Sequence, residues 1–296
     1  MLKLFRMDLY RMVRMKSFYI ILAILVALNI VTFLLDVPSN PETEKAETAE
    51  TELTSDNGFS DFIEGFEDAA TEESDSNAVV GLSIILSADE QGRYHLEECL
   101  QGIFKGMLVA VFIVIFTVIF TTADFNNGYI KNYGGQLDRR YKIVLAKAMS
   151  IAVYTAAAFV MNIASFFLGA YIAGKSVTVD HYSDLFLLIG VQYALHLAFA
   201  LFIMALCFII RNNLIMMILA NLICFHVFSA LYVVIEKALE KLGCGKIELL
   251  KFSPSGRIML YDYAAGKNGS ALLVGGVFII VSLFASGLYI SKKDLA

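Results

Sequence analysis

The sequence predicts an all-α integral membrane protein with six transmembrane helices. Of its 296 residues, 58% are hydrophobic and only 17% are charged, a composition too apolar for an ordinary soluble domain. A helix needs about 20 apolar residues to cross the hydrocarbon of a bilayer. Six runs approach or exceed that length, at residues 17–36, 103–122, 149–172, 185–210, 214–235 and 271–291.

Residues 1–16 predict an interfacial amphipathic helix. Its apolar residues recur at three- and four-residue spacing and share one face: Leu2, Phe5, Leu9, Met12 and Val13. Lys3, Arg11 and Arg14 are expected to point elsewhere, toward anionic headgroups. A simple basic anchor that orients the first span is the alternative. Because the first span is bulky and lacks a small-residue cleavage site, we expect it to be retained rather than removed as a signal peptide.

The distribution of basic residues predicts cytoplasmic termini. With that orientation, 13 of the 23 Lys and Arg residues flank spans on the inner side. They are Lys3, Arg6, Arg11, Arg14, Lys16, Lys131, Arg139, Arg140, Lys142, Lys147, Arg211, Lys292 and Lys293. The outer segment at 236–270 fits less well, because it carries six basic residues of its own.

Residues 37–102 form an acidic outer segment after the first span. Between positions 37 and 101 there are 17 Asp and Glu against Lys45 and Arg93, a net charge of −15. Such a block is expected to be solvated, and its field would concentrate cationic ligands. A flexible loop without a ligand is the alternative.

The loop at 123–148 is the most informative inner segment. Asp124 or Asn126 could cap a short helix, Gly134 and Gly135 would end it, and Asp138 could cap the next helix. Such a helix would expose Tyr129, Ile130 and Tyr133 as a rigid knob that suits a groove on a soluble partner. A solvated inner loop is the alternative.

The pattern in this loop resembles the first cytoplasmic loop of type-2 ABC (ATP-binding-cassette) exporter permeases, in particular the small six-span permeases of Gram-positive bacteria. The matching positions are Asp124, Gly128, Ile130, Lys131, Asn132, Arg139 and Lys147. In that family the loop contains the coupling helix that docks on the ATPase subunit. The resemblance therefore implies an ATPase-docking loop that uses Asp124, Asn127, Gly128, Ile130, Lys131, Tyr133, Asp138, Arg139 and Arg140.

The resemblance also implies a function. The chain would be a permease in a bacterial plasma membrane, alternating access as a separate, soluble ABC ATPase binds and hydrolyses ATP with Mg. It would pair with a second permease, as a homodimer or heterodimer, and its cargo could be an antimicrobial peptide or a drug. It would itself bind no cofactor, metal or nucleic acid, and it would not be an enzyme. An ATP-independent transporter, or a sensor with an acidic ligand-recruiting ectodomain, is the alternative.

Residues 169–176 satisfy the P-loop pattern G-x₄-G-K-[ST], but their context argues against nucleotide binding. A P-loop follows a strand and begins a helix, so that backbone amides surround the phosphate. Here the pattern closes a long apolar run on the outer side. Helix termination at Gly174 explains the glycine without any ligand.

Several polar residues lie inside the apolar runs and are candidates for a pathway or for contacts within the bundle: Asn162, Gln192, His196, Asn221 and His226. Polar groups in lipid must find partners, so interhelical hydrogen bonds are the simpler explanation. Cys99 and Cys244 would both lie outside, where a disulfide between them is conceivable.

Overall fold

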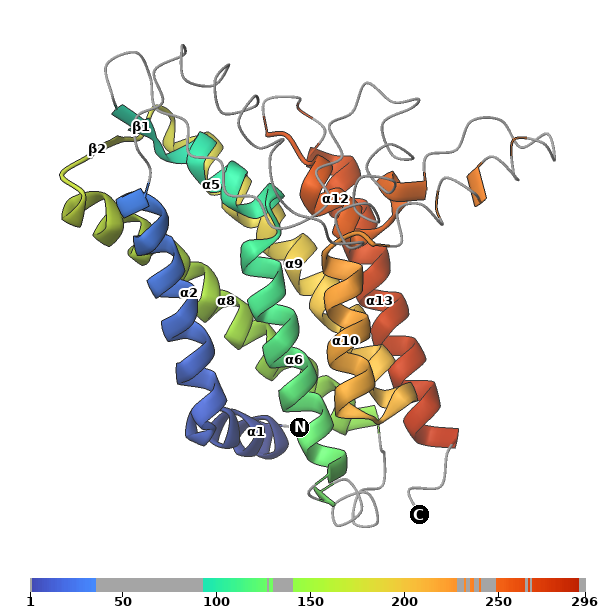
Figure 1. Cartoon of the computed structure of the whole chain (residues 1–296). Helices are drawn as coiled ribbons and strands as arrows, with labels where there is room; N and C mark the ends of the chain where they lie inside the picture. The colour runs from blue at the N-terminus through green and yellow to red at the C-terminus, as the bar shows by residue number, and fades with distance from the viewer. Residues whose placement is uncertain are drawn as a thin grey trace, which may run out of the picture.

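Long apolar helices dominate the computed structural model of the chain (Figure 1). The structure describes residues 2–35, 93–126, 128–129, 141–227, 249–263 and 268–292, with positions 232, 235, 236, 240 and 266. Five described helices are long and apolar enough to cross a membrane: α2 (Lys16–Leu35), α6 (Leu108–Asn126), α8 (Tyr141–Ile172), α9 (Tyr182–Ile210) and α13 (Asn268–Lys292). The prediction of a helical, multi-pass membrane protein is supported at this level.

The helices run between two ends of a bundle, which Figure 1 sets at its bottom and top. We call the bottom the proximal end, since α1 (Leu2–Arg14) and the last turns of α13 lie there. The top is the distal end. It holds β1 (Arg93–His95), β2 (Ser176–Thr178), α5 (Leu96–Lys105), the 3₁₀ helix η1 (Leu249–Phe252) and α12 (Pro254–Leu260).

Close packing joins α2 to α8 and α9 to α13. Gly169 of α8 allows the first contact, because a Cβ atom there would lie 2.8 Å from Cδ2 of Phe33 and 3.3 Å from the Cα of Ile30. Aromatic side chains fill part of the core between α6 and α8, where the rings of Phe116 and Tyr154 stack at 3.6 Å between centroids. Much of the remaining surface of α2 and α13 is apolar and exposed, as lipid-facing helices require.

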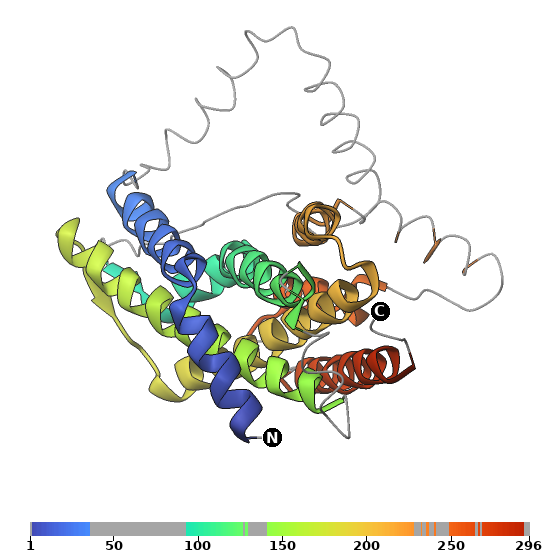
Figure 2. The ribbon, with the colours of Figure 1, turned by 90° about the horizontal axis from the view of Figure 1, so that it is seen from below.

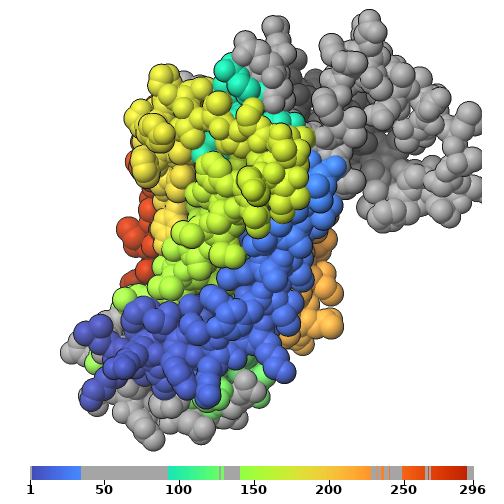
Figure 3. All heavy atoms as spheres, turned by 90° about the vertical axis from the view of Figure 1, so that its left-hand side faces the viewer, coloured from blue at the N-terminus to red at the C-terminus, as the bar shows by residue number. Residues whose placement is uncertain are grey.

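Helix α1 lies across α2 and α8 at the proximal end of the bundle, as Figures 2 and 3 show from two directions. A helix is present here as predicted, but its packed face differs from the predicted one. Met12 is buried as expected, whereas Leu2 and Val13 are 80% and 44% exposed. Asp8 takes an inner position instead, at 4% exposure. The prediction that Arg11 points away from this face is wrong, because ionic contacts described below draw it inward.

The predicted second span, 103–122, is interrupted. α5 ends at Lys105, Gly106 and Met107 form a turn, and α6 begins at Leu108. Met107 adopts a left-handed φ of 59°, which breaks the helix although Gly106, Met107 and Leu108 are themselves compatible with a hydropathy run. α5 therefore belongs to the distal end, and α6 alone continues toward the proximal end (Figure 1).

The predicted fifth span, 214–235, is not one uninterrupted helix. α10 (Asn213–Cys224) has 12 residues, and residues 225–227 form a turn in which His226 has a φ of 54°. At 1.5 Å per residue, α10 covers about 18 Å, less than the hydrocarbon thickness of about 30 Å. α8, in contrast, begins eight residues before its predicted start, and it packs against α1.

At the distal end, β1 and β2 pair in parallel, with Tyr94 opposite Val177. The P-loop-like residues 169–176 lie here. Gly169 is inside α8, Gly174 follows it with a φ of 68°, and Ser176 begins β2. A motif that starts in a helix and ends in a strand has the reverse of the P-loop order, in agreement with its rejection.

The predicted acidic segment up to position 92 and the predicted pairing with Cys244 lie outside the described residues. Cys99 itself is buried in α5.

Candidate functional site

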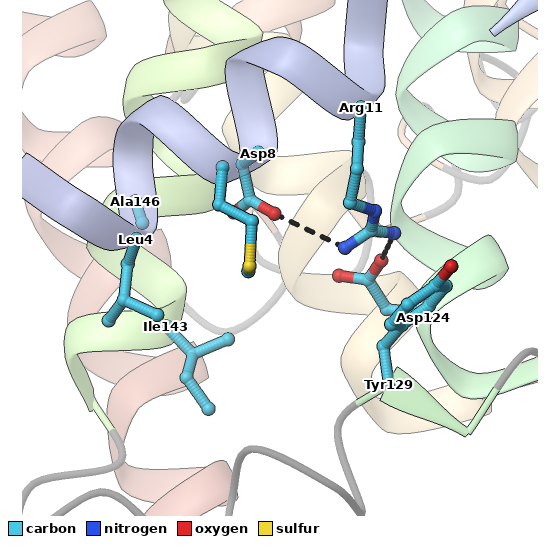
Figure 4. Close-up of a pocket in the computed structure, with 8 residues that line it drawn as sticks. Leu4, Asp8, Arg11, Asp124, Tyr129, Ile143 and Ala146 are labelled. Carbon is cyan, nitrogen blue, oxygen red and sulfur yellow. Dashed lines mark hydrogen bonds and ion pairs between the residues drawn. The ribbon is translucent and has the colours of Figure 1, made fainter. Parts of the chain in front are cut away.

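Four charged side chains from three helices meet at the proximal end. α1 contributes Asp8 and Arg11, α6 contributes Asp124, and α8 contributes Lys147. Nζ of Lys147 lies 2.6 Å from Oδ2 of Asp124, and Nη2 of Arg11 donates to the other oxygen of the same carboxylate. Nη1 of Arg11 lies 3.3 Å from Oδ1 of Asp8. We call these four residues the charge cluster; Figure 4 shows three of them.

The charge cluster is buried and electrically balanced. Lys147 is fully enclosed, and Asp8 and Asp124 are 4% and 3% exposed. Buried ions are tolerated only when they are paired and their remaining donors are satisfied. Lys147 meets that condition, because Nζ also donates to the carbonyl oxygen of Phe120 at 3.2 Å and lies 3.6 Å from the centre of its ring.

The surroundings of the charge cluster shift the pKa values of its two α1 residues, Asp8 and Arg11. Burial raises the pKa of Asp8, and the neighbouring Asp124 carboxylate adds to the rise, while Lys147 and Arg11 oppose it. Burial alone would lower the pKa of Arg11, but the Asp124 carboxylate outweighs it and raises that pKa. Arg11 is therefore a permanent cation, while the charge of Asp8 depends on pH.

The first residues after α6 fold back onto the cluster. Gly128 has a φ of 68°, where a non-glycine residue would be strained, and its N–H donates to the carbonyl oxygen of Phe125 at 3.2 Å. This turn places the ring of Tyr129 4.0 Å from Cζ of Arg11. A small pocket opens beside them, lined by Leu4, Met7, Asp8, Arg11, Asp124, Tyr129, Ile143 and Ala146 (Figure 4).

The predicted ATPase-docking residues are only partly described. Asp124 lies in the last turns of α6 rather than in the loop, and its carboxylate is enclosed by this chain. Gly128 and Tyr129 lie beside it. The others lie outside the described residues: Asn127, Ile130, Lys131, Tyr133, Asp138, Arg139 and Arg140. Their role toward a partner stays a prediction.

Sequence reasoning missed Asp8, although one signal was present. Asp8 is the only acidic residue among the first sixteen, which include five cations. It also lies four residues from both Leu4 and Met12, on the side of the helix that packs. A lone acid on the inner side of a basic helix indicates an internal ionic partner.

The polar residues within the helices do not gather at one site. Asn162 accepts a hydrogen bond from Nδ2 of Asn29 at 2.9 Å, which joins α8 to α2. Gln192 donates to the carbonyl oxygen of Ile258 at 3.3 Å, which joins α9 to α12. Asn221 donates within its own helix, to Met217 at 2.7 Å.

The two histidines also occupy separate places. The ring of His196 contacts Gln192 through Nδ1 at 2.8 Å and packs edge-on against Phe104 and Phe159. His226 is buried in the turn after α10. These contacts are those of helix packing, and the part of the chain that the structure describes contains no group of three His, Cys, Asp or Glu residues arranged to hold a metal.

The charge cluster is thus the candidate functional site. Its ion pairs connect three helices, α1, α6 and α8. Comparison with protein-family models and with curated proteins gives no match to this chain.

Proposed function

We propose that this chain is the membrane-spanning permease subunit of an exporter that a separate ABC ATPase drives. The observation that carries the proposal is the position of the charge cluster. Residues 127–140 connect the end of α6 to the start of α8. The charge cluster links α1, α6 and α8 close to both ends of this connection. A force applied to that loop would therefore move three helices together rather than one.

The geometry supports such transmission because the joint is stiff. The carboxylate of Asp124 holds cations from both neighbouring helices, and displacement of either would leave a buried charge unpaired. Tyr129, on the loop side, rests on Arg11, so movement of the loop would reach α1 directly. Coupling through packed elements with charged contacts is how two distant sites influence each other.

The rest of the proposal follows the family that the loop resembles. The chain would cross a bacterial plasma membrane six times with cytoplasmic termini. A second permease would complete the pathway, ATP and Mg would bind to the ATPase, and the cargo would be an antimicrobial peptide or a drug.

Site-specific photo-cross-linking tests the proposal. Tyr141 and Tyr171 lie at opposite ends of α8 and are 39% and 84% exposed, so a photoreactive residue at either position samples one end of the bundle. The full chain is co-expressed with an ABC ATPase encoded beside its gene. We expect a cross-link to the ATPase from position 141 and none from position 171.

Two substitutions sharpen this experiment. Gly128→Pro and Arg139→Glu should reduce co-purification of the ATPase, whereas Lys175→Glu, a charge reversal beyond the distal end of α8, should leave it unchanged. Cross-linking from position 171 alone, or undiminished binding in both loop variants, would remove the assignment.

A further inference from the structure

Arg211 is a second cationic site at the proximal end, and it differs from the charge cluster. It lies in the two-residue connection between α9 and α10, where its backbone N–H donates to the carbonyl oxygen of Cys207 at 3.0 Å. Its Cζ atom lies 5.3 Å from the ring centre of Phe125 on α6 and 5.7 Å from that of Tyr289 on α13. Two aromatic side chains from different helices therefore fix the position of the guanidinium.

The charge of Arg211 is uncompensated within the described residues. Nε and Nη2 are enclosed and have no hydrogen-bond acceptor, and no described carboxylate pairs with the group. Arg11 and Lys147, in contrast, share Asp124. The positive end of the α10 dipole lies at the next residues, which adds to the local potential. A half-enclosed cation in this setting attracts an anion from outside the chain.

The surface beside Arg211 is apolar. Large side chains on either side of it in the sequence are exposed: Ile209 by 50%, Leu214 by 70%, Ile215 by 50% and Ile218 by 56%. In a membrane protein such side chains face acyl chains. An anion that reaches Arg211 along this surface must therefore carry apolar chains of its own.

We propose that Arg211 binds the phosphate of a membrane phospholipid whose acyl chains lie along the exposed side of α10. Arginine suits this role, because its planar guanidinium matches the geometry of phosphate oxygens and stays charged at all relevant pH values. Free phosphate offers the same head chemistry, but it would make no use of the apolar side chains.

Fluorescence quenching tests the site directly. The chain contains no tryptophan, so Phe125→Trp places a single tryptophan, whose fluorescence can be excited apart from that of tyrosine, against the guanidinium. The purified full chain, in detergent, is titrated with phosphatidylglycerol brominated in its acyl chains and, separately, with a brominated diacylglycerol that lacks phosphate. We expect half-maximal quenching at an about tenfold lower mole fraction of the phospholipid, as one charge-assisted hydrogen bond predicts.

Matched variants separate the phosphate contact from general lipid contact. Arg211→Gln in the Phe125→Trp background should abolish the preference for the phospholipid. It keeps a non-glycine residue at a φ of 56°, so the backbone strain of the parent is retained. Tyr171→Trp, at the distal end of α8, should be quenched equally by both lipids in the presence or absence of Arg211.

Three results would overturn the proposal. One is equal quenching of Phe125→Trp by the two lipids, a comparison that stands even if the Arg211→Gln variant does not fold. Another is a phospholipid preference that survives Arg211→Gln. The third is displacement of the brominated phospholipid by millimolar inorganic phosphate, which would identify a soluble phosphate as the ligand instead.

Discussion

Loss of the Asp124 carboxylate should be among the most destabilising single changes at the proximal end. Asp124→Asn removes the anion that holds both Arg11 and Lys147 while it keeps the size of the side chain. Removal of one partner from a buried ion pair costs about 3–5 kcal/mol of unfolding free energy. Lys147 retains the carbonyl oxygen and the ring of Phe120, so we expect the lower end, about 3 kcal/mol.

Thermal unfolding of the purified full chain in detergent, followed by far-ultraviolet circular dichroism, measures this loss. At about 2–4 °C per kcal/mol for a chain of this class, Tm should fall by roughly 6–12 °C. Asp180→Asn is the matched control. It makes the same chemical change at the distal end, in a carboxylate that is 55% exposed and lies 2.7 Å from Nδ1 of His95. Exposed pairs contribute about 1 kcal/mol at most.

A double variant tests the pairing itself. Lys147→Met alone should also destabilise the chain, because it leaves Asp124 with one cation fewer. Combined with Asp124→Asn it should cost less than the sum of the single changes, by about 0.5–3 kcal/mol. If Asp124→Asn lowers Tm no more than Asp180→Asn, or if the two changes at the cluster are additive, the described ion pair does not stabilise the fold and the reasoning fails.

Three further predictions concern other parts of the structure. Burial raises the pKa of Asp8 above its ordinary value of 3.8, so the folded state binds this proton more tightly than the unfolded state, and stability should fall as the pH rises from 3.8 through the raised pKa. Asp8→Asn should lack that fall. Parallel curves of Tm against pH for parent and variant would contradict this prediction. Gly169→Ala should lower the free energy of unfolding by about 1–3 kcal/mol, because the new methyl group would push α2 away from α8. Gly190→Ala, with no atom within 4 Å of the new methyl group, should be neutral or stabilising. Equal Tm values for the two variants would refute the close contact between α2 and α8. Asn29→Val should lower the free energy of unfolding by about 1–2 kcal/mol, because it removes the hydrogen bond to Asn162. The loss should be smaller when Asn162 is already replaced by valine. Chemical unfolding of the variants in mixed micelles measures both values.

The long helices could be predicted because lipid imposes a simple rule on sequence. Residues 185–210 and 271–291 are apolar along most of their length, and hydropathy alone locates α9 and α13 to within three residues. The same rule could not find the turn at Gly106 and Met107. Both residues are compatible with an apolar run, and only the left-handed φ of Met107 reveals the break.

The charge cluster could not be predicted, for a different reason. Periodicity tells which residues share a face of one helix, but Arg11 and Asp124 are 113 positions apart and meet only because α1 turns back beneath the bundle. The sequence placed Arg11 among the cations facing headgroups, where most basic residues of such a helix belong. Its inward orientation depends on Asp124, whose approach to Arg11 becomes evident only in three dimensions.

Non-covalent contacts hold α1 and α2 to the rest of the bundle at three levels. Arg11 pairs with Asp124 near the proximal end, and Asn29 donates a hydrogen bond to Asn162 along α2. Near the distal end the ring of Phe33 packs against those of Phe166 and Tyr94. None of these contacts depends on peptide continuity between residues 35 and 93. A protein cut within that interval should therefore stay together as two complementary fragments, which could be expressed separately and assembled in one membrane.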